Sequence, residues 1–182
     1  MSLWRSIHEI TPTLYLSSGT AVSNKQAVLD KKINCIINAT IDLPNRSWNS
    51  SIEVIRVPVN DVPHAQIYPY FDKVADLIEQ KSRRGERCLV HCVAGVSRSA
   101  SLCIAYLIKY HRMTLKQAHS HVRHSRPVIR PNVGFWKQLI DYEKKMRGTK
   151  SVAMVHSPIG LIPDIYLHET RNMVAFVGGS RR

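Results

Sequence analysis

Residues 91–99 read His-Cys-Val-Ala-Gly-Val-Ser-Arg-Ser, and this stretch decides the fold of the chain. The apolar residues 88–90 lead into it, and the apolar run 100–108 follows it. This order predicts a strand that turns sharply into a helix. At such a turn, consecutive backbone N–H groups and the helix dipole converge on one point, where an oxyanion binds. The stretch therefore predicts a phosphate-binding loop.

Side chains in this stretch supply chemistry as well as binding. The field that favours an anion at the turn also favours a thiolate at Cys92, and a thiolate is a nucleophile at neutral pH. Arg98, six positions later, can return to the same point and offer its guanidinium fork to two phosphate oxygens. Gly95 lets the backbone close around the anion, and Ser99 can donate a hydrogen bond to the sulfur. We therefore expect Cys92 to attack a bound phosphate.

The other three cysteines fit a structural role, because Cys35, Cys88 and Cys103 each lie within an apolar strand or helix pattern. Their spacing suggests neither a disulfide framework nor a zinc site. No stretch approaches the roughly 18 apolar residues of a membrane span, and residues 1–5 lead into no signal peptide. We expect a cytoplasmic protein, with the nucleus as an additional compartment and no integral membrane association.

The remainder of the chain alternates strand and helix signals. We predict strands at residues 7–10, 14–17, 35–37, 54–59 and 88–90, and helices at 25–32, 68–84, 100–108, after Thr114 and after Asn132. Strands joined by helical crossovers predict an α/β domain with a central mixed sheet flanked by helices. We expect one catalytic domain over residues 1–148. Residues 149–182 would be a C-terminal extension that packs back on the domain and ends in a disordered tail.

The formal net charge is +13, and the isoelectric point is near 9.9. Such a charge is typical of proteins that bind nucleic acid, membranes or acidic substrates. The basic residues are scattered, with short clusters only at 81–84 and 144–147, and aromatic residues are not interleaved with them as in a stacking platform. The charge therefore favours phosphorylated, acidic substrates over nucleic acid.

The motif His-Cys-x5-Arg-Ser resembles the signature of the cysteine-dependent protein tyrosine phosphatases. Residues 94–100 look like the small dual-specificity branch in particular, and so do Asn60-Asp61, residues 105–108 and residues 130–136. Together with residues 158–166, these stretches resemble an atypical subgroup that lacks a separate kinase-docking domain. The resemblance covers residues 5–168 and implies a single phosphatase domain with a strand–phosphate-loop–helix active site.

Cleavage of a phosphoester also needs a proton donor, because an alkoxide is a poor leaving group. In the phosphatases that the signature resembles, an aspartate on a loop upstream of the cysteine supplies this proton. Asp61 lies 31 residues before Cys92, on a segment that Pro63 marks as a loop. The resemblance implies that Asp61 is the general acid and then the general base, with a phosphocysteine intermediate between the two steps.

Alternatives to this assignment exist in the sequence. From its position alone, Asp61 could equally cap a turn. Asp42, Asp72 and Asp76 are the competing acids, although Asp72 and Asp76 fall within the predicted helix 68–84, where a solvated face accounts for them.

The resemblance implies roles for further residues. His91 would orient the loop and help to keep the sulfur ionised, and Asn132 would hydrogen-bond the loops that frame the site. Arg126 and Arg130 could form a second anion pocket, although exposed arginines are common near active sites. The phosphate would be bound by the loop residues Val93, Ala94, Gly95, Val96, Ser97 and Arg98. No metal or other cofactor is expected, because the arginine and the loop amides would stabilise the phosphate charge.

The variable loop positions 93, 94, 96 and 97 are uncharged, whereas phosphoinositide phosphatases of this superfamily usually carry lysines there. A phosphoprotein substrate with phosphotyrosine, phosphoserine or phosphothreonine is therefore favoured. The resemblance suggests MAP kinases or members of their pathways as candidates. Two alternatives stay open: a catalytically weak module that binds phosphoproteins, and a phosphatase of a non-protein phosphoester.

Overall fold

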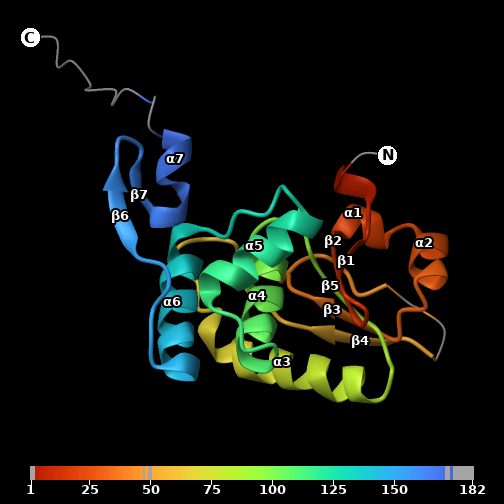
Figure 1. Ribbon diagram of the computed structural model, residues 1–182. Helices are drawn as coiled ribbons and strands as arrows, with labels where there is room; N and C mark the ends of the chain where they lie inside the picture. The colour runs from red at the N-terminus through yellow and green to blue at the C-terminus, as the bar shows by residue number, and fades with distance from the viewer. Residues whose placement is uncertain (1–2, 47, 49–50, 171–172, 174–182) are drawn as a thin grey trace, which may run out of the picture.

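A five-stranded mixed sheet forms the centre of the protein (Figure 1). The computed structural model describes residues 3–46, 48, 51–170 and 173. The strands of the sheet are β1 (His8–Thr11), β2 (Leu14–Ser18), β3 (Cys35–Asn38), β4 (Glu53–Arg56) and β5 (Cys88–Cys92). They lie in the order β1-β2-β5-β3-β4, with β1 antiparallel to β2 and the other neighbouring pairs parallel. The predicted central mixed sheet is confirmed.

Strand β5 lies in the middle of the sheet and pairs on both sides. Its register places Val90 opposite Leu16 of β2 and Ile37 of β3, and it places Cys92 opposite Ser18. The carboxyl ends of β5 and its two parallel neighbours therefore meet at one edge, which is the usual binding edge of an α/β sheet.

Strand β4 is shorter than the predicted strand 54–59. Its pairing with β3 ends at Arg56, after which residues 57–59 leave the sheet. The carbonyl oxygen of Val59 instead accepts a hydrogen bond from Nη1 of Arg98 at 3.2 Å. This departure directs the chain toward the predicted phosphate loop.

The helices of the domain differ in length. The chain opens with the short turn η1 (Leu3–Arg5). Two short helices, α1 (Gly19–Val22) and α2 (Lys25–Asp30), follow β2. The longer helices are α3 (Tyr68–Arg83), α4 (Arg98–Tyr110), α5 (Leu115–Ser125) and α6 (Val133–Arg147). Helix α4 is almost completely buried and packs against α3, α5 and α6. The apolar pattern of residues 100–108 on all sides of the helix is the sequence signal of this burial.

The two faces of the sheet have different covers, because alternate residues along a strand point to opposite faces. On β5, Val90 and Cys92 point into a large hydrophobic core that the sheet shares with α3, α4, α5 and α6. Leu89 points the other way, into a small cluster with Val22 of α1 and Val28 of α2. We call these two sides the large-core face and the small-core face.

Two predicted helix starts are confirmed in atomic detail. Thr114 and Gln117 form a capping box, in which each side chain accepts a hydrogen bond from the other residue's backbone N–H. Oδ1 of Asn132 accepts the Phe135 N–H at 2.9 Å and so caps α6. These signals are local in the sequence, which is why the sequence alone predicts them.

After α6, the chain forms the hairpin β6 (Met154–Ser157) and β7 (Gly160–Pro163), then η2 (Asp164–Tyr166) and α7 (Leu167–Thr170). Tyr166 is buried: its hydroxyl lies 2.9 Å from Nε2 of His119, and its ring meets the ring of Trp136 edge-on. This segment therefore packs against α5 and α6. The division of the chain at residue 148 stays a prediction, and the predicted tail from residue 174 onward lies outside the described residues.

Candidate active site

The predicted phosphate loop joins the end of β5 to Arg98, the first residue of α4. Gly95 lies in the middle of this loop with a φ of +68°, a conformation that favours glycine. A Cβ at this position would lie 2.5 Å from the carbonyl oxygen of Ser17. Only glycine therefore allows the loop to approach the end of β2 so closely.

Cys92 lies at the base of the loop, with 1 % of its surface exposed. Its Sγ accepts a hydrogen bond from the Gly95 N–H at 3.2 Å and lies 3.1 Å from Oγ of Ser99. Hydrogen-bond donors around a sulfur stabilise the thiolate relative to the thiol. The geometry therefore suits the predicted nucleophile, and Ser99 lies where the sequence places it.

The side chain of Arg98 returns to the same loop and is buried, with 7 % of the residue exposed. Its Nη1 donates to the carbonyl of Val59 at 3.2 Å, but its buried Nε has no hydrogen-bond partner among the described residues. Buried polar groups in folded proteins are nearly always hydrogen-bonded. A bound oxyanion would supply the partner that this N–H group lacks.

Asp61 brings a carboxylate to the same place. Its Oδ2 lies 3.7 Å from Nε of Arg98, and its Oδ1 accepts a hydrogen bond from Nδ2 of Asn132 at 2.9 Å. About a third of the side chain, 33 %, is exposed. A carboxyl group beside Arg98 is within reach of an oxygen that leaves a phosphate bound there.

Two of the competing aspartates lie on α3 and have other partners. Burial alone would raise the pKa of Asp72, but hydrogen bonds from Lys109, Lys145 and Tyr142 outweigh this effect and lower the pKa to about 2. A hydrogen bond from Lys109 also lowers the pKa of Asp76. Partners on α4 and α6 thus hold these two carboxyl groups, whereas the Asp61 carboxylate lies beside Arg98. The general-acid role of Asp61 stays a prediction.

Asn132 joins three parts of the site. Besides capping α6, its backbone N–H donates to Oγ of Ser97 at 3.0 Å, and its side chain donates to Asp61. One residue thus ties the phosphate loop, the acid and the start of α6 together. This arrangement agrees with the framing role expected from the sequence.

Arg126 contributes in a way that the sequence did not reveal. It is fully buried, its Nε donates to the Gly95 carbonyl at 2.7 Å, and its Nη2 donates to the Ala94 carbonyl at 3.0 Å. The Ala94 carbonyl and the Gly95 N–H belong to one peptide group and point in opposite directions. By holding the carbonyl, Arg126 therefore directs the N–H toward Sγ of Cys92.

Arg130 also has partners of its own. Its Nη1 lies 2.7 Å from Oε2 of Glu169, and its guanidinium lies 4.3 Å from the ring centroid of Tyr166. Arg126 is thus buried against loop carbonyls, and Arg130 shares the Glu169 carboxylate with Arg123. The second anion pocket considered for Arg126 and Arg130 stays a prediction. Sequence distance hid both contacts, because Glu169 follows Arg130 by 39 residues.

Two residues of α6 hold the segment that follows Asp61. A Cβ at Gly134 would lie 1.7 Å from the carbonyl oxygen of Pro63, so only glycine permits this approach. Gln138 donates from Nε2 to the Ala65 carbonyl at 2.9 Å, and its Oε1 accepts two backbone N–H groups at the start of α3 at 2.8 and 2.9 Å. A glycine inside a helical pattern was the available sequence signal for this close contact.

His91 precedes the nucleophile but points to the small-core face. Its Nδ1 lies 3.3 Å from the Cys92 carbonyl oxygen. Burial lowers the pKa of its imidazole to about 4, so the ring is neutral at physiological pH. His91 therefore contacts the nucleophile through the backbone, and not through the sulfur.

The structure also bears on metals and membranes. Over the described ranges, no three histidine, cysteine, aspartate or glutamate side chains come together in a way that could hold a metal ion. Within the same residues, no helix combines the length and apolar character that a membrane span needs.

The sequence pattern described as "Dual specificity phosphatase, catalytic domain" matches residues 14–145. The chain belongs to the dual-specificity phosphatase family. It is a cysteine-dependent phosphoric monoester hydrolase, and members of this family act on phosphorylated proteins. The matched range includes the phosphate loop, Asp61 and Asn132.

Individual relatives agree with this family. Human dual specificity protein phosphatase 14 is 50 % identical over 172 residues, which are 94 % of this chain and 86 % of the relative. Human dual specificity protein phosphatase 21 is 46 % identical over 170 residues, which are 93 % of this chain and 89 % of the relative. The crystal structure of human DUSP28 matches with a TM-score of 0.74 and 30 % identity over 78 % of this chain and 95 % of that one.

Proposed function

We propose that this phosphatase hydrolyses phosphotyrosine, phosphoserine and phosphothreonine in proteins through a phosphocysteine intermediate. One observation carries the proposal: the buried Sγ of Cys92, an Arg98 Nε without a hydrogen-bond partner among the described residues, and the Asp61 carboxylate converge on one loop. A nucleophile, an anion binder and a proton donor are the three groups that metal-free phosphoester cleavage needs.

In the first step, the Cys92 thiolate forms a bond to phosphorus while the bond from phosphorus to the leaving oxygen breaks. Asp61 gives its proton to that oxygen, which leaves as a neutral hydroxyl. In the second step, the Asp61 carboxylate takes a proton from water as the water oxygen bonds to phosphorus. The sulfur–phosphorus bond then breaks, and the Ser99 hydroxyl stabilises the returning thiolate. Arg98 and the loop amides bind the equatorial oxygens throughout.

The substrates we propose are phosphorylated proteins, with MAP kinases or members of their pathways as candidates. A protein substrate is supported by the uncharged loop side chains of Val93, Ala94 and Val96, which offer no cation to the additional phosphates of a phosphoinositide ring. We also propose the cytoplasm, together with the nucleus, as the compartment of this activity. Imaging of the full-length chain in cells tests this, and a secreted protein would contradict it.

The substrate class is tested with the purified protein on matched phosphotyrosyl, phosphoseryl and phosphothreonyl peptides and on phosphoinositides. We expect release of phosphate from the peptides. A preference for phosphoinositides would favour the alternative of a non-protein phosphoester. Binding of the peptides without release of phosphate would favour the alternative of a phosphoprotein-binding module.

The role of Asp61 is tested by Asp61→Asn. Loss of the proton donor should slow cleavage by about 10²–10⁴-fold for an aryl phosphate whose leaving phenol has a high pKa. The loss should be much smaller for an aryl phosphate whose leaving phenol is acidic and needs no proton. Asp72→Asn is the control, because Asp72 lies on α3 and forms ion pairs with Lys109 and Lys145, so its loss removes those pairs and leaves Asp61 in place. It should lower the free energy of unfolding and leave the rate unchanged. If Asp61→Asn lost the same factor in rate on both aryl phosphates, the proton transfer would belong to another group.

A further inference from the structure

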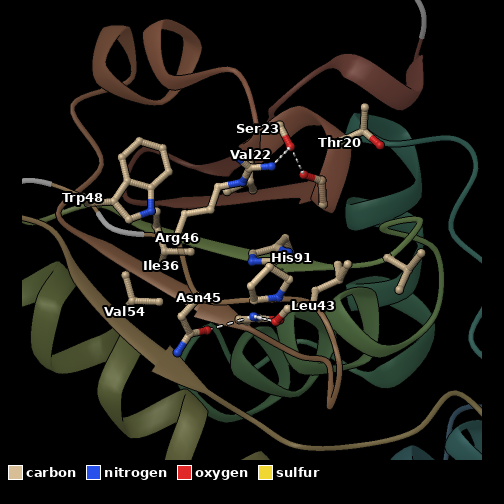
Figure 2. A pocket seen from close by; sticks show the side chains of 14 residues that line it. Thr20, Val22, Ser23, Ile36, Leu43, Asn45, Arg46, Trp48, Val54 and His91 are labelled. Carbon is tan, nitrogen blue, oxygen red and sulfur yellow. Dashed lines mark hydrogen bonds between the residues drawn. The ribbon is translucent and has the colours of Figure 1, made fainter.

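A cavity of about 210 Å³ lies beside the end of β5, between the loop after β3 and helix α1 (Figure 2). Its apolar lining comes from Val22, Ile36, Leu43, Pro44, Trp48 and Val54. Polar groups come from Thr20, Ser23, Asn38, Asn45, Arg46 and His91. A concave apolar site with a few polar groups is the usual form of a small-molecule site.

This cavity is separate from the site of phosphate cleavage. His91 lines it, whereas the next residue, Cys92, points into the large core on the other face of the sheet. Ile36 of β3 lines the cavity as well and belongs to the small-core cluster. The catalytic sulfur and the cavity therefore lie on opposite faces of the same strand end.

The wall of the cavity is fixed by hydrogen bonds before any ligand binds. Arg56, at the end of β4, donates to the carbonyls of Thr40 and Ile41 at 2.9 Å and to that of Leu43 at 2.8 Å. Nδ2 of Asn38 also donates to the Leu43 carbonyl, at 3.0 Å. A wall held at several points costs little ordering entropy when a ligand binds.

The charge of the lining selects the kind of ligand. Of the described residues around the cavity, Arg46 is the only one with a formal charge, and it lies at the rim with Nη2 2.8 Å from Oγ of Ser23. Since the imidazole of His91 is neutral, the interior offers no second charge. We propose that this cavity binds a small amphipathic anion, with its apolar body against Val22, Ile36 and Val54 and its acidic group at Arg46.

A ligand here would affect the phosphate loop through short contacts. Gly19 and Val93 line the cavity, and the Gly19 N–H donates to the Val93 carbonyl at 3.0 Å. A Cβ at Gly19 would lie 3.2 Å from the Cys92 carbonyl oxygen, which shows how closely α1 approaches the loop. The bound anion should therefore change the turnover number, and it should not compete with substrate.

The probe is phenylbutyrate, with phenylbutanol as the neutral analogue of the same apolar body. Binding is measured by calorimetry on the full-length protein with vanadate, a phosphate mimic, saturating the active site. We expect phenylbutyrate to bind in the presence of vanadate and phenylbutanol to bind about fivefold more weakly, since the neutral probe loses an ion pair that contributes about 1 kcal/mol. Displacement by vanadate, equal binding of the two probes, or no binding at millimolar concentration would each overturn the proposal.

Variants locate the probe. Arg46→Gln should weaken phenylbutyrate binding by about the same factor as removal of the charge from the probe, and Val54→Phe should block binding by filling the cavity. Arg84→Gln is the matched control, because Arg84 is exposed and lies outside the cavity lining. Circular dichroism checks that each variant is folded. Unchanged affinity in folded Arg46→Gln would overturn the proposal, and because binding is measured without turnover, the result is independent of the proposed reaction.

Discussion

His91 and Cys92 are neighbours on β5, yet they point to opposite faces of the sheet, and the two faces are packed differently. On the large-core face, four helices cover the sheet, and the sulfur of Cys92 lies within hydrogen-bond distance of Gly95 and Ser99. On the small-core face, the short helices α1 and α2 pack on the sheet, and a cavity that α1 lines lies beside His91. The predicted nucleophile therefore lies where packing fixes its position, as catalysis needs geometry held to a fraction of an ångström.

The largest expected effect is a difference in catalytic rate between variants of Cys92 and variants of His91. Cys92→Ser should abolish turnover and keep phosphate binding, because the loop amides and Arg98 remain. His91→Asn removes only a neutral hydrogen bond to the backbone, so its rate should fall by about tenfold at most, as expected for a contact of about 1 kcal/mol. Steady-state kinetics on an aryl phosphate measures both.

Two results would contradict this assignment of the reaction to the large-core face. A Cys92→Ser enzyme that keeps a tenth of the wild-type rate would remove the nucleophile from the large-core face. A His91→Asn enzyme that is as inactive as Cys92→Ser, while folded, would mean that the small-core face also carries the reaction.

The second prediction compares the packing of the two faces with adjacent isoleucines of β3. Ile37 points into the large core and Ile36 into the small cluster that borders the cavity. Ile37→Ala should lower the free energy of unfolding by about 2–5 kcal/mol, as large-to-small core substitutions do. Ile36→Ala should cost less, because one side of its side chain already lacks packing partners. Urea denaturation of both variants measures the difference, and equal losses would mean that the two faces are packed alike.

The smallest expected effect concerns pH. Burial lowers the pKa of His91 and of His119 to about 4 from the ordinary value of 6.5. Between these values, the unfolded chain binds more protons than the folded one, so stability is fully present above pH 6.5 and falls as the pH drops toward 4. Each histidine should contribute up to about 1.4 kcal/mol per pH unit in this window.

Denaturation of the wild type, His91→Asn and His119→Gln across this pH window measures the two contributions. Each substitution should reduce the pH dependence of the free energy of unfolding by a similar amount, although the two histidines lie on different faces. His64→Asn, at an exposed side chain, is the control. If the pH dependence of the unfolding free energy did not change in His91→Asn, the ring of His91 would not be buried as the structure shows it.

Much of the site was predictable because its signals are local. The phosphate loop needs a strand, a glycine, an arginine and a helix within a few residues, and the sequence presents them in this order. The caps at Thr114 and Asn132 also depend on residues three positions away. For Asp61, position alone left a turn cap open, and the resemblance to a phosphatase signature was needed to favour the general acid.

The sequence by itself thus determined the α/β class, the buried helix α4 and the residues of the phosphate loop, because these depend on periodicity and short spacing. Only the tertiary structure decided that Arg126 holds the loop carbonyls, that Arg130 pairs with Glu169, and that Gly134 lies against Pro63. These contacts join residues 31 or more positions apart, where no local spacing applies. Their geometry is set by how the helices and the C-terminal segment pack around the sheet, and side-chain chemistry alone does not encode it.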